Sequence, residues 1–404
     1  MRSVDPRDLL LGWFTAALDA VDGRQCVRSA VARRTFQAPI SLIAIGKAAV
    51  AMAQGAHDVL GDRIEAGFVV TKHGHEGPLP WPVLTAGHPM PDQASLDAGN
   101  AMLVFIDRLP KENEVLFLLS GGASSLVEVL APGIGLAHLR QLNKWLLASG
   151  TNIVIANELR KRVSMIKAGR LAQKLAPHSV ICLTISDVPG NNPHSIGSGP
   201  LAAPGDFVPP ETLPTWVLEL INRTPDAVSP AGFDHVQTDI IATVEDARLA
   251  AAKAARSDGY EVTLHEALLA GDALLAGSQL AAVMKTSRPG QVSLWGGETT
   301  VQLPPETGRG GRCQSLALAA AIALEGTSGQ YLLAVGTDGS DGPGDDAGAL
   351  VDDHTVQRGR AAGFDAAQML ESADAGSFLE ASGDLITTGP TGTNVMDLVI
   401  GLTI

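Results

Sequence analysis

A lysine follows a short apolar segment at a place where an anionic ligand is often bound. Lys47 comes directly after 43–46 (IAIG) and before an alanine-rich stretch that predicts a helix. The first turn of a helix favours anions because its N–H groups are unpaired and the helix dipole is positive there. Lys47 is therefore either an anion ligand or an ordinary solvated lysine. The segment is not a Walker A loop, because Ala48 stands where Ser or Thr is required.

A second segment, 118–126 (LLSGGASSL), ends a strand-like apolar run with small residues. Small residues let backbone N–H groups turn toward a phosphate or carboxylate, and serine hydroxyls add further donors. A plain tight turn needs one or two glycines and no cluster of serines. We therefore favour anion binding by the residues of this loop, which are Ser120, Gly121, Gly122, Ala123, Ser124 and Ser125.

Basic residues are concentrated between 157 and 175, which holds six of the 29 lysines and arginines of a chain whose net charge is −14. A helix is expected here, because Leu159, Val163 and Ile166 would share one face. The basic residues then either form a solvated face, which is the commoner arrangement, or face a phosphate. The binding candidates of this segment are Asn157, Lys161 and Lys167.

Three loops rich in acidic, amide and hydroxyl groups are further candidates: 186–193 (SDVPGNNP), 336–349 (GTDGSDGPGDDAGA) and 387–397 (TTGPTGTNVMD). Carboxylates are suitable ligands for Mg²⁺ or Ca²⁺, and one that follows a strand can also act as a catalytic base. Aspartates in loops often only cap helices or form turns. The candidates are Asp187, Thr337, Asp338, Asp341, Thr391 and Asn394.

Arg312 begins a predicted helix after the glycines of 307–314 (TGRGGRCQ), where a guanidinium presents a fork to carboxylate or phosphate. Glu298, in the segment GGETT, is another binding candidate. Of the ten histidines, His73 and His75 are spaced as HxH before Glu76, but no second histidine or cysteine pair accompanies them, and the three cysteines lie far apart with no CxxC. Neither a zinc site nor a disulfide framework is expected.

The elements that must position these residues alternate between apolar strands and helices, which predicts an α/β fold with mostly parallel, Rossmann-like sheets. Strands are expected at 41–46, 67–71, 83–87, 115–120, 179–186, 239–243, 262–264, 291–295, 299–303, 331–336 and 397–404. Helices are expected at 6–22, after Lys47, and at 244–258, 272–287 and 312–325. Ligands bind at the carboxyl ends of parallel strands, where most of the candidate loops lie.

The length of 404 residues exceeds one ordinary hydrophobic core, so two domains are expected, at 1–235 and 236–404. The net charge of −14 disfavours nucleic acid and anionic membranes as partners. The apolar run near the N-terminus is too short for a signal peptide or a membrane span. We expect a soluble, cytoplasmic protein that acts on a small molecule.

The chain resembles class II glycerate 2-kinases from about Arg7 to its end, because nine motifs occur in the family's order. They are IAIGKAA, TAGHPMPD, LLSGGASSL, LR followed by IKAGRLA, SDVPG, GGETT, GGRCQ, GTDGSDGP and TGPTGTN. The resemblance implies an N-terminal glycerate-kinase domain, a C-terminal MOFRL-type domain and an active cleft between them. It also implies that ATP and Mg²⁺ are required and that D-glycerate is phosphorylated at its 2-hydroxyl.

The resemblance implies catalytic roles for Lys47, Asp187 and Arg312, which match the lysine of IxxGK, the aspartate of SDVPGDDP and the arginine of GGRNQ in the family. Asp187 and Asp338 are the metal candidates. The sequence departs from the family's pattern at Ala168, Asn191, Asn192, Cys313 and Met396, where the family has Gly, two acids, Asn and Asn.

Two other functions stay open at this point. An NAD(P)H-dependent hydroxypyruvate reductase would need a dinucleotide site, but the chain has no GxGxxG motif. A non-catalytic sensor that binds a sugar acid would have similar glycine loops but no need for the acidic loops around Asp187 and Asp338. The oligomeric state is also open, with a homodimer as one candidate.

Overall fold

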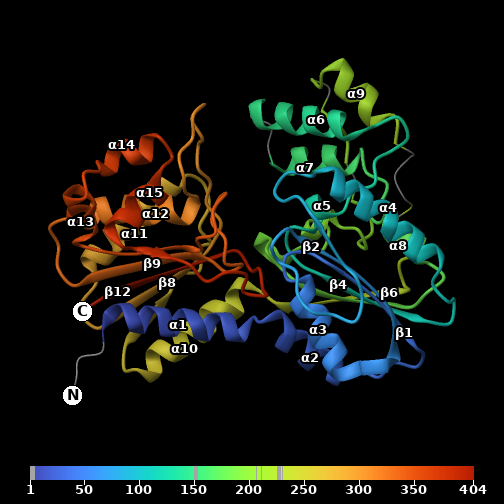
Figure 1. The fold of residues 1–404 in the computed structure, drawn as a ribbon, viewed down its shortest axis with the longest axis horizontal. Helices are drawn as coiled ribbons and strands as arrows, with labels where there is room; N and C mark the ends of the chain where they lie inside the picture. The colour runs from blue at the N-terminus through green and yellow to red at the C-terminus, as the bar shows by residue number, and fades with distance from the viewer. Residues whose placement is uncertain (1–4, 150–152, 206, 211, 225–228, 230) are drawn as a thin grey trace. The chain divides into compact units, whose positions relative to one another are not determined.

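The structure, a computed structural model, describes residues 5–149, 153–205, 207–210, 212–224, 229 and 231–404. The chain divides into two compact units, each with its own six-stranded sheet (Figure 1). The N-terminal unit is Gly23–Ile241. The C-terminal unit combines the chain up to Asp22 with Ala242–Ile404.

The sheet of the N-terminal unit has the strand order β3-β2-β1-β4-β5-β6. Its strands are β1 (Ile40–Ile45), β2 (Ile64–Lys72), β3 (Val83–Ala86), β4 (Glu114–Leu119), β5 (Val180–Ile185) and β6 (Val236–Ala242). The pairs among β1 to β5 are all parallel. Every residue of β1 is buried, as expected of a central strand covered on both faces.

Helices cover both faces of this sheet (Figure 1). One face carries α2 (Gly23–Ala32) and α3 (Ala49–Leu60), and the other carries α4 (Gln93–Asp107), α5 (Ala123–Leu126) and α8 (Arg170–Lys174). Beyond them, α6 (Leu136–Ala148), α7 (Ile153–Lys161) and α9 (Thr215–Ile221) enclose a separate small core. Short 3₁₀ helices lie at Gly61–Arg63, Pro189–Asn191 and Ile196–Ser198.

The sheet of the C-terminal unit has the order β11-β10-β9-β12-β8-β7. Its strands are β7 (Glu261–Leu264), β8 (Gln291–Gly297), β9 (Gln330–Gly336), β10 (Gly348–Asp352), β11 (Leu385–Ile386) and β12 (Asp397–Thr403). β12 is antiparallel to both of its neighbours, β10 is antiparallel to β9 and β11, and β7 is parallel to β8. The sheet is therefore mixed, whereas the sequence predicted a mostly parallel one; the last strand enters between β8 and β9 in the reverse direction.

The C-terminal unit packs α11 to α15 around a second core, rich in alanine. These helices are α11 (Ala273–Thr286), α12 (Arg312–Leu324), α13 (Thr355–Ala361), α14 (Ala366–Glu371) and α15 (Ala375–Ser382), whereas α10 (Val244–Ser257) lies against α1, β7 and β8. α12 begins at Arg312, as the sequence predicted, and ten of its thirteen residues are buried. This burial fixes the position of the helix start, and with it Arg312.

The first helix, α1 (Pro6–Ala20), packs on the C-terminal unit, so the predicted domains 1–235 and 236–404 differ from the two compact units. Its apolar face contacts α10. Trp13 Nε1 donates to Asp258 Oδ2 at 2.7 Å, and the Trp13 ring meets the edge of Tyr260 at 5.2 Å between centroids. Nothing in the local sequence of α1 reveals that its cover is supplied by residues more than 230 positions away.

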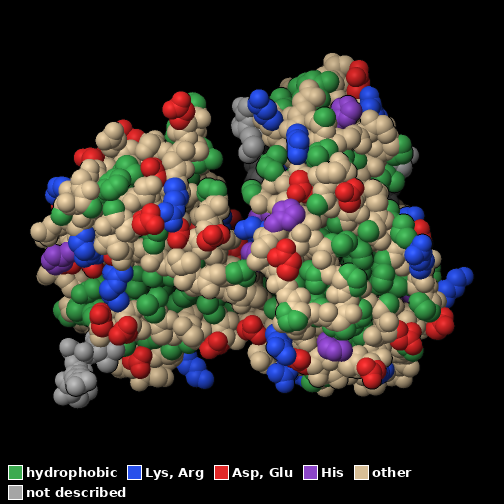
Figure 2. All heavy atoms as spheres, in the orientation of Figure 1, with side chains coloured by type: hydrophobic (Ala, Val, Ile, Leu, Met, Phe, Trp, Pro, Cys, Tyr) green, Lys and Arg blue, Asp and Glu red, His purple; other side chains and the backbone are tan. Residues whose placement is uncertain are grey.

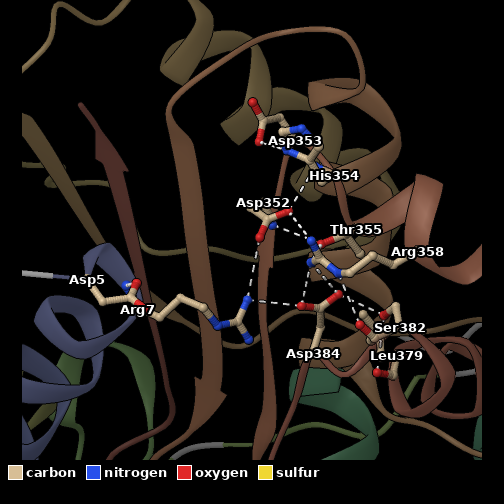
Figure 3. A network of polar contacts seen from close by, with 10 residues as sticks. All are labelled: Asp5, Arg7, Asp352, Asp353, His354, Thr355, Arg358, Leu379, Ser382 and Asp384. Carbon is tan, nitrogen blue, oxygen red and sulfur yellow. Dashed lines mark hydrogen bonds and ion pairs between the residues drawn. The ribbon is translucent and has the colours of Figure 1, made fainter.

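Four charged side chains fix the start of α1 to the C-terminal unit (Figure 3). Arg7 Nη1 lies 3.0 Å from Asp384 Oδ1 and 3.6 Å from Asp352 Oδ2. Arg358 donates to Asp352 at 2.9 Å and to both oxygens of Asp384 at 2.7 and 2.9 Å. The side chain of Asp384 is only 1% exposed, so the two guanidiniums compensate a carboxylate that has been removed from water.

Most of the predicted elements are confirmed, and three differ. No strand forms at 299–303, where Thr300 makes only an isolated bridge to Asp272. The segment 157–175 is not one helix: α7 ends at Lys161, α8 begins at Arg170, and Ala168 and Gly169 between them have φ of +50° and +79°. β10 arises from the end of a segment predicted as loop.

None of the helices that the structure describes is long and apolar enough to span a membrane. On the face seen in Figure 2, acidic side chains are interspersed with lysines and arginines in each unit. The charge of that face is therefore mixed and is not gathered into one extended patch.

Candidate functional site: an anion loop and two buried ion pairs

Lys47 and the glycine-rich loop meet where β1 and β4 end. These strands pair in parallel with Ile45 opposite Leu119, so the residues that follow them are neighbours. A Cβ atom added to Gly46 would lie 2.1 Å from Ser120 Oγ, which requires glycine at this contact. Lys47 N donates to Gly121 O at 2.9 Å. The structure thus brings together two segments that the sequence singled out separately.

Ser120 positions the loop and does not face solvent. It is fully buried, and its Oγ accepts a hydrogen bond from Ala48 N at 3.1 Å. A Cβ at Gly122 would lie 3.2 Å from Lys47 Cγ, so the stem of the lysine passes close to this glycine. Among the described residues, the N–H groups at 121–123 have no hydrogen-bond acceptor. These N–H groups and the lysine ammonium are the donors that an anion would meet here.

Asp187 lies at the same edge of the sheet, two residues after β5, which pairs in parallel with β4. Its side chain is half-buried. The two asparagines in this loop shape its turn: Asn191 has φ of +53°, and Asn192 Oδ1 accepts from His194 N at 3.0 Å. Asp187 is therefore the carboxylate that this turn presents at the strand end.

A cavity of about 360 Å³ lies beside α5, between the small core of α6 and α7 and the loop that precedes α4. Four of the predicted binding residues line it, namely Ser124, Ser125, Asn157 and Lys167. Its wall also contains Glu128 and Arg160, which were not among the predicted site residues. The residues that line the cavity all belong to the N-terminal unit.

Lys167 forms a buried ion pair in the cavity wall. Its Nζ lies 2.5 Å from Glu128 Oε2 and donates to Ser124 O at 2.8 Å. Ser164 Oγ donates to the other oxygen of Glu128 at 2.6 Å. The side chains of Lys167 and Glu128 are 6% and 0% exposed, so each charge is compensated by its partner. The sequence analysis missed Glu128, although an acid inside the apolar run LVEVLA is a signal that could have identified it.

Lys161 lies outside this cavity, although the sequence grouped it with Lys167. Its Nζ is 2.5 Å from Glu158 Oε1. Together with Arg162 and Arg170 it lines a much smaller pocket of about 30 Å³. The break in the predicted helix is the reason, since it carries the two lysines to different places.

Arg312 is held by a buried carboxylate in the C-terminal unit. Its Nε and Nη2 donate to the two oxygens of Asp397 at 2.6 and 2.8 Å, and Nη1 lies 3.0 Å from Glu298 Oε1. The side chain of Asp397 is 5% exposed, that of Glu298 45%. Burial opposes the charge on the guanidinium, but the two carboxylates outweigh it and raise the pKa of Arg312. Asp397, the first residue of β12, was missed by the sequence analysis.

Asp341 caps α12, the helix that Arg312 begins. Its Oδ1 accepts from Cys313 N at 3.0 Å and its Oδ2 from Gln314 N at 2.8 Å. The carboxylate is 1% exposed. Burial and the neighbouring charge of Asp397 raise the pKa of Asp341 to about 6, despite the two backbone donors.

The remaining candidates lie in two loops of the same unit, one that follows β9 and one that precedes β12. Thr337 Oγ1 donates to Met396 O at 2.6 Å, and Thr391 Oγ1 donates to Thr337 O at 2.5 Å. Asp338 Oδ1 accepts a backbone N–H two residues further on at 2.9 Å. Asn394 is 5% exposed. Thr337 and Thr391 thus hold the two loops together, close to the carboxylate that holds Arg312.

The raised pKa of Asp341 predicts a pH-dependent effect of Asp341→Asn on stability. The carboxyl group binds its proton more strongly in the folded chain, so it favours folding below its unfolded pKa near 3.8, and this contribution is lost as pH rises through about 6. Between about pH 5 and pH 8 the Tm of Asp341→Asn should rise relative to wild type, by the equivalent of about 1 kcal/mol. Calorimetric melting at both pH values checks this, with Asp345→Asn, an exposed neighbour, as the control. A constant Tm difference would mean that Asp341 titrates normally.

Known proteins are similar to this chain over most of its length. Residues 9–217 match the family described as "Domain of unknown function (DUF4147)" and residues 291–397 match the MOFRL family. The chain is 39% identical over 379 residues to the D-glycerate 2-kinase of Thermotoga maritima, with 90% of each chain covered. It is 32% identical to the glycerate 2-kinase of Pyrococcus horikoshii, covering 100% of this chain and 98% of the relative.

The fold agrees as well. The crystal structure of glycerate kinase from Thermotoga maritima superposes with a TM-score of 0.83 at 36% identity, over 98% of this chain and 99% of that chain. The α/β class that the sequence predicted is therefore confirmed. With both domain matches in order and this identity over most of its length, the chain belongs to the class II glycerate kinase family.

Proposed function

We propose that this protein transfers the γ-phosphoryl group of ATP to the 2-hydroxyl of D-glycerate, giving 2-phosphoglycerate and ADP. The observation that carries the proposal is that Lys47 lies beside a loop whose N–H groups at 121–123 have no acceptor among the described residues, in a chain of the glycerate kinase family. Phosphoryl transfer depends mainly on positioning and on neutralising phosphate charge, which are the tasks such donors perform. We further expect the enzyme to act in the cytoplasm on small molecules.

In this proposal the positive groups act on the transferring phosphate or on the carboxylate of glycerate. Lys47 and Arg312 are the two cations, and the loop at 120–124 binds phosphate through its backbone. Asp187 accepts the proton of the attacking hydroxyl or contributes to metal binding. The remaining binding candidates for substrate or nucleotide are Asn157, Lys161, Lys167, Glu298, Thr337, Asp338, Thr391 and Asn394.

Mg²⁺ is the metal we propose, with Asp187 as the first candidate for its protein ligand and Asp338 as the second. Around neither aspartate do the described residues include three side chains of metal-ligating type in mutual reach. Kinases commonly hold Mg²⁺ with one or two carboxylates and complete its coordination with substrate phosphates and water, so single aspartates fit this metal. The bound ion would neutralise phosphate charge.

Measurement of ADP release tests the proposal. Purified protein is supplied with D-glycerate, ATP and Mg²⁺, and separately with hydroxypyruvate and NADH or NADPH. ADP formation that depends on glycerate is the expected result. Oxidation of the nicotinamide cofactor without ADP release would instead establish a reductase. If neither assay shows activity but the protein binds glycerate, the protein is a sensor.

Asp187→Asn is expected to raise the Mg²⁺ concentration needed for half-maximal rate, or to abolish turnover. An amide offers one neutral oxygen where the carboxylate offers charge. Initial rates against Mg²⁺ concentration are measured for wild type, Asp187→Asn and Asn191→Asp. Asn191→Asp should change the Mg²⁺ curve little or lower the requirement, since it adds a carboxylate to the same turn. If Asp187→Asn gives the wild-type curve, the ion is held elsewhere, and Asp338 is the next residue to test.

A further inference from the structure

Arg160 lies in the cavity wall of the N-terminal unit and donates hydrogen bonds to two side chains. Its Nε donates to Asn143 Oδ1 at 2.8 Å, and its Nη1 donates to Asn157 Oδ1 at 3.0 Å. Both acceptors are neutral amides. Among the residues that the structure describes, no carboxylate forms an ion pair with this guanidinium. In contrast, Lys167 in the same wall is paired with Glu128 at 2.5 Å.

The environment of Arg160 opposes its charge. Its side chain is half-buried, and burial alone lowers the pKa of the guanidinium. A charge removed from water is costly unless an opposite charge or a full set of hydrogen bonds compensates it. The cavity wall holds two cations, Arg160 and Lys167, and one anion, Glu128, which leaves a net charge of +1 in a chain of −14. A negative ligand would complete this balance.

The donors that remain on Arg160 suit an oxyanion. Nε and one N–H of Nη1 are used by the two amides, so the second N–H of Nη1 and both of Nη2 are left. This end of the guanidinium can donate two parallel hydrogen bonds to a carboxylate or a phosphate. Ser124 and Ser125 line the same cavity and add hydroxyl groups. The volume of about 360 Å³ falls within the range of pockets for small ligands.

We propose that this cavity is an oxyanion-binding site in which Arg160 is the direct ligand of a carboxylate or phosphate group. Asn143 and Asn157 orient the guanidinium, and the Lys167–Glu128 pair forms the neutral part of the wall. The identity of the ligand rests on the proposed function, under which the oxyanion is the carboxylate of glycerate or a phosphate of the nucleotide. The existence of the site rests only on the cavity and on the uncompensated charge.

Equilibrium binding to the full-length protein tests the site without turnover. Isothermal titration calorimetry is performed with D-glycerate, ADP and inorganic phosphate, each on wild type, Arg160→Gln and Arg140→Gln. Arg140 is an exposed arginine of α6 next to the cavity residue Leu139 and serves as the matched control. Arg160→Gln should weaken at least one of the three ligands by about tenfold to a hundredfold, because a charge-assisted bidentate contact is lost. Arg140→Gln should bind like wild type.

Comparison of the three titrations, with glycerate, ADP and inorganic phosphate, identifies the chemical group that Arg160 binds. Weakening of glycerate binding alone identifies a carboxylate, and weakening of ADP or inorganic phosphate identifies a phosphate. If wild type binds none of the three, or if Arg160→Gln binds all of them as wild type does, the proposal is wrong. Loss of oxyanion affinity in a protein that releases no ADP would uphold the site and reject the kinase function.

Thermal melting of the same proteins separates a ligand role from a purely structural one. Without ligand, Arg160→Gln should melt at or above the wild-type Tm, since the substitution removes an uncompensated charge. The binding ligand should raise the Tm of wild type and of Arg140→Gln but not that of Arg160→Gln. If Arg160→Gln does not fold, Arg160→Lys replaces it: lysine keeps the charge and loses the fork, so binding should still weaken. Wild-type affinity in the lysine variant would overturn the assignment of a bidentate contact.

Discussion

Arg312→Ala is expected to lower kcat/KM for phosphoryl transfer by about 10³-fold and to lower stability at the same time. The activity loss follows from removing a cation that neutralises phosphate charge, an effect of this order in related chemistry. The stability loss follows from Asp397, whose carboxylate is 5% exposed and would lose its bidentate partner. Removing one member of a buried ion pair costs about 3 kcal/mol or more. Steady-state kinetics and calorimetric melting measure the two effects.

A double variant separates these two consequences. Arg312→Ala with Asp397→Asn removes the orphaned charge, so the Tm should recover most of the loss while the activity stays low. Arg312→Lys keeps a positive charge but cannot reproduce the bidentate contact, and it should fall between wild type and alanine in both measurements. If Arg312→Ala melts like wild type, Asp397 finds another partner. If it turns over like wild type, Arg312 lies outside the reaction.

Lys47→Ala is expected to lower kcat/KM by a similar factor, about 10³-fold, with little change in Tm. The lysine is half-buried and its stem passes close to Gly122, so alanine leaves the backbone hydrogen bond from residue 47 to Gly121 intact. Lys144→Ala, which removes an exposed lysine of α6, is the control and should leave both quantities unchanged. Near-wild-type turnover in Lys47→Ala would place this residue outside the site. A large fall in Tm would show that it supports the fold instead.

The contrast between the two variants comes from the structure. From the sequence, neither substitution is expected to change the melting temperature, because surface cations contribute little to stability. The structure retains that expectation for Lys47 and reverses it for Arg312. The partner of Arg312 is 85 residues away in the chain, and no local pattern indicated the pairing.

The sequence by itself determined the short-range features of this protein, namely individual strands, loops and helix starts. The apolar run 41–46 predicted β1, and the glycine and lysine that follow it predicted a loop able to bind an anion. The start of α12 at Arg312 was predicted from its glycines. The order of nine motifs predicted the family. The strand, the loop and the helix start depend on hydrophobic periodicity and on backbone preferences over a few residues, so the sequence of each segment is enough to predict them.

Only the tertiary structure shows which strands, helices and charged side chains are neighbours. It placed β12 between β8 and β9 in the reverse direction, α1 on the unit that follows residue 241, and Asp397 beside Arg312. The predicted helix is interrupted after Lys161, so Lys167 reaches the buried Glu128. Arg160 lines a cavity in which none of the described carboxylates pairs with it. The physical reason is that burial and charge compensation over the whole fold determine which strands pair and which charged groups form ion pairs. The local sequence around one residue contains no information about a partner that is distant in the chain.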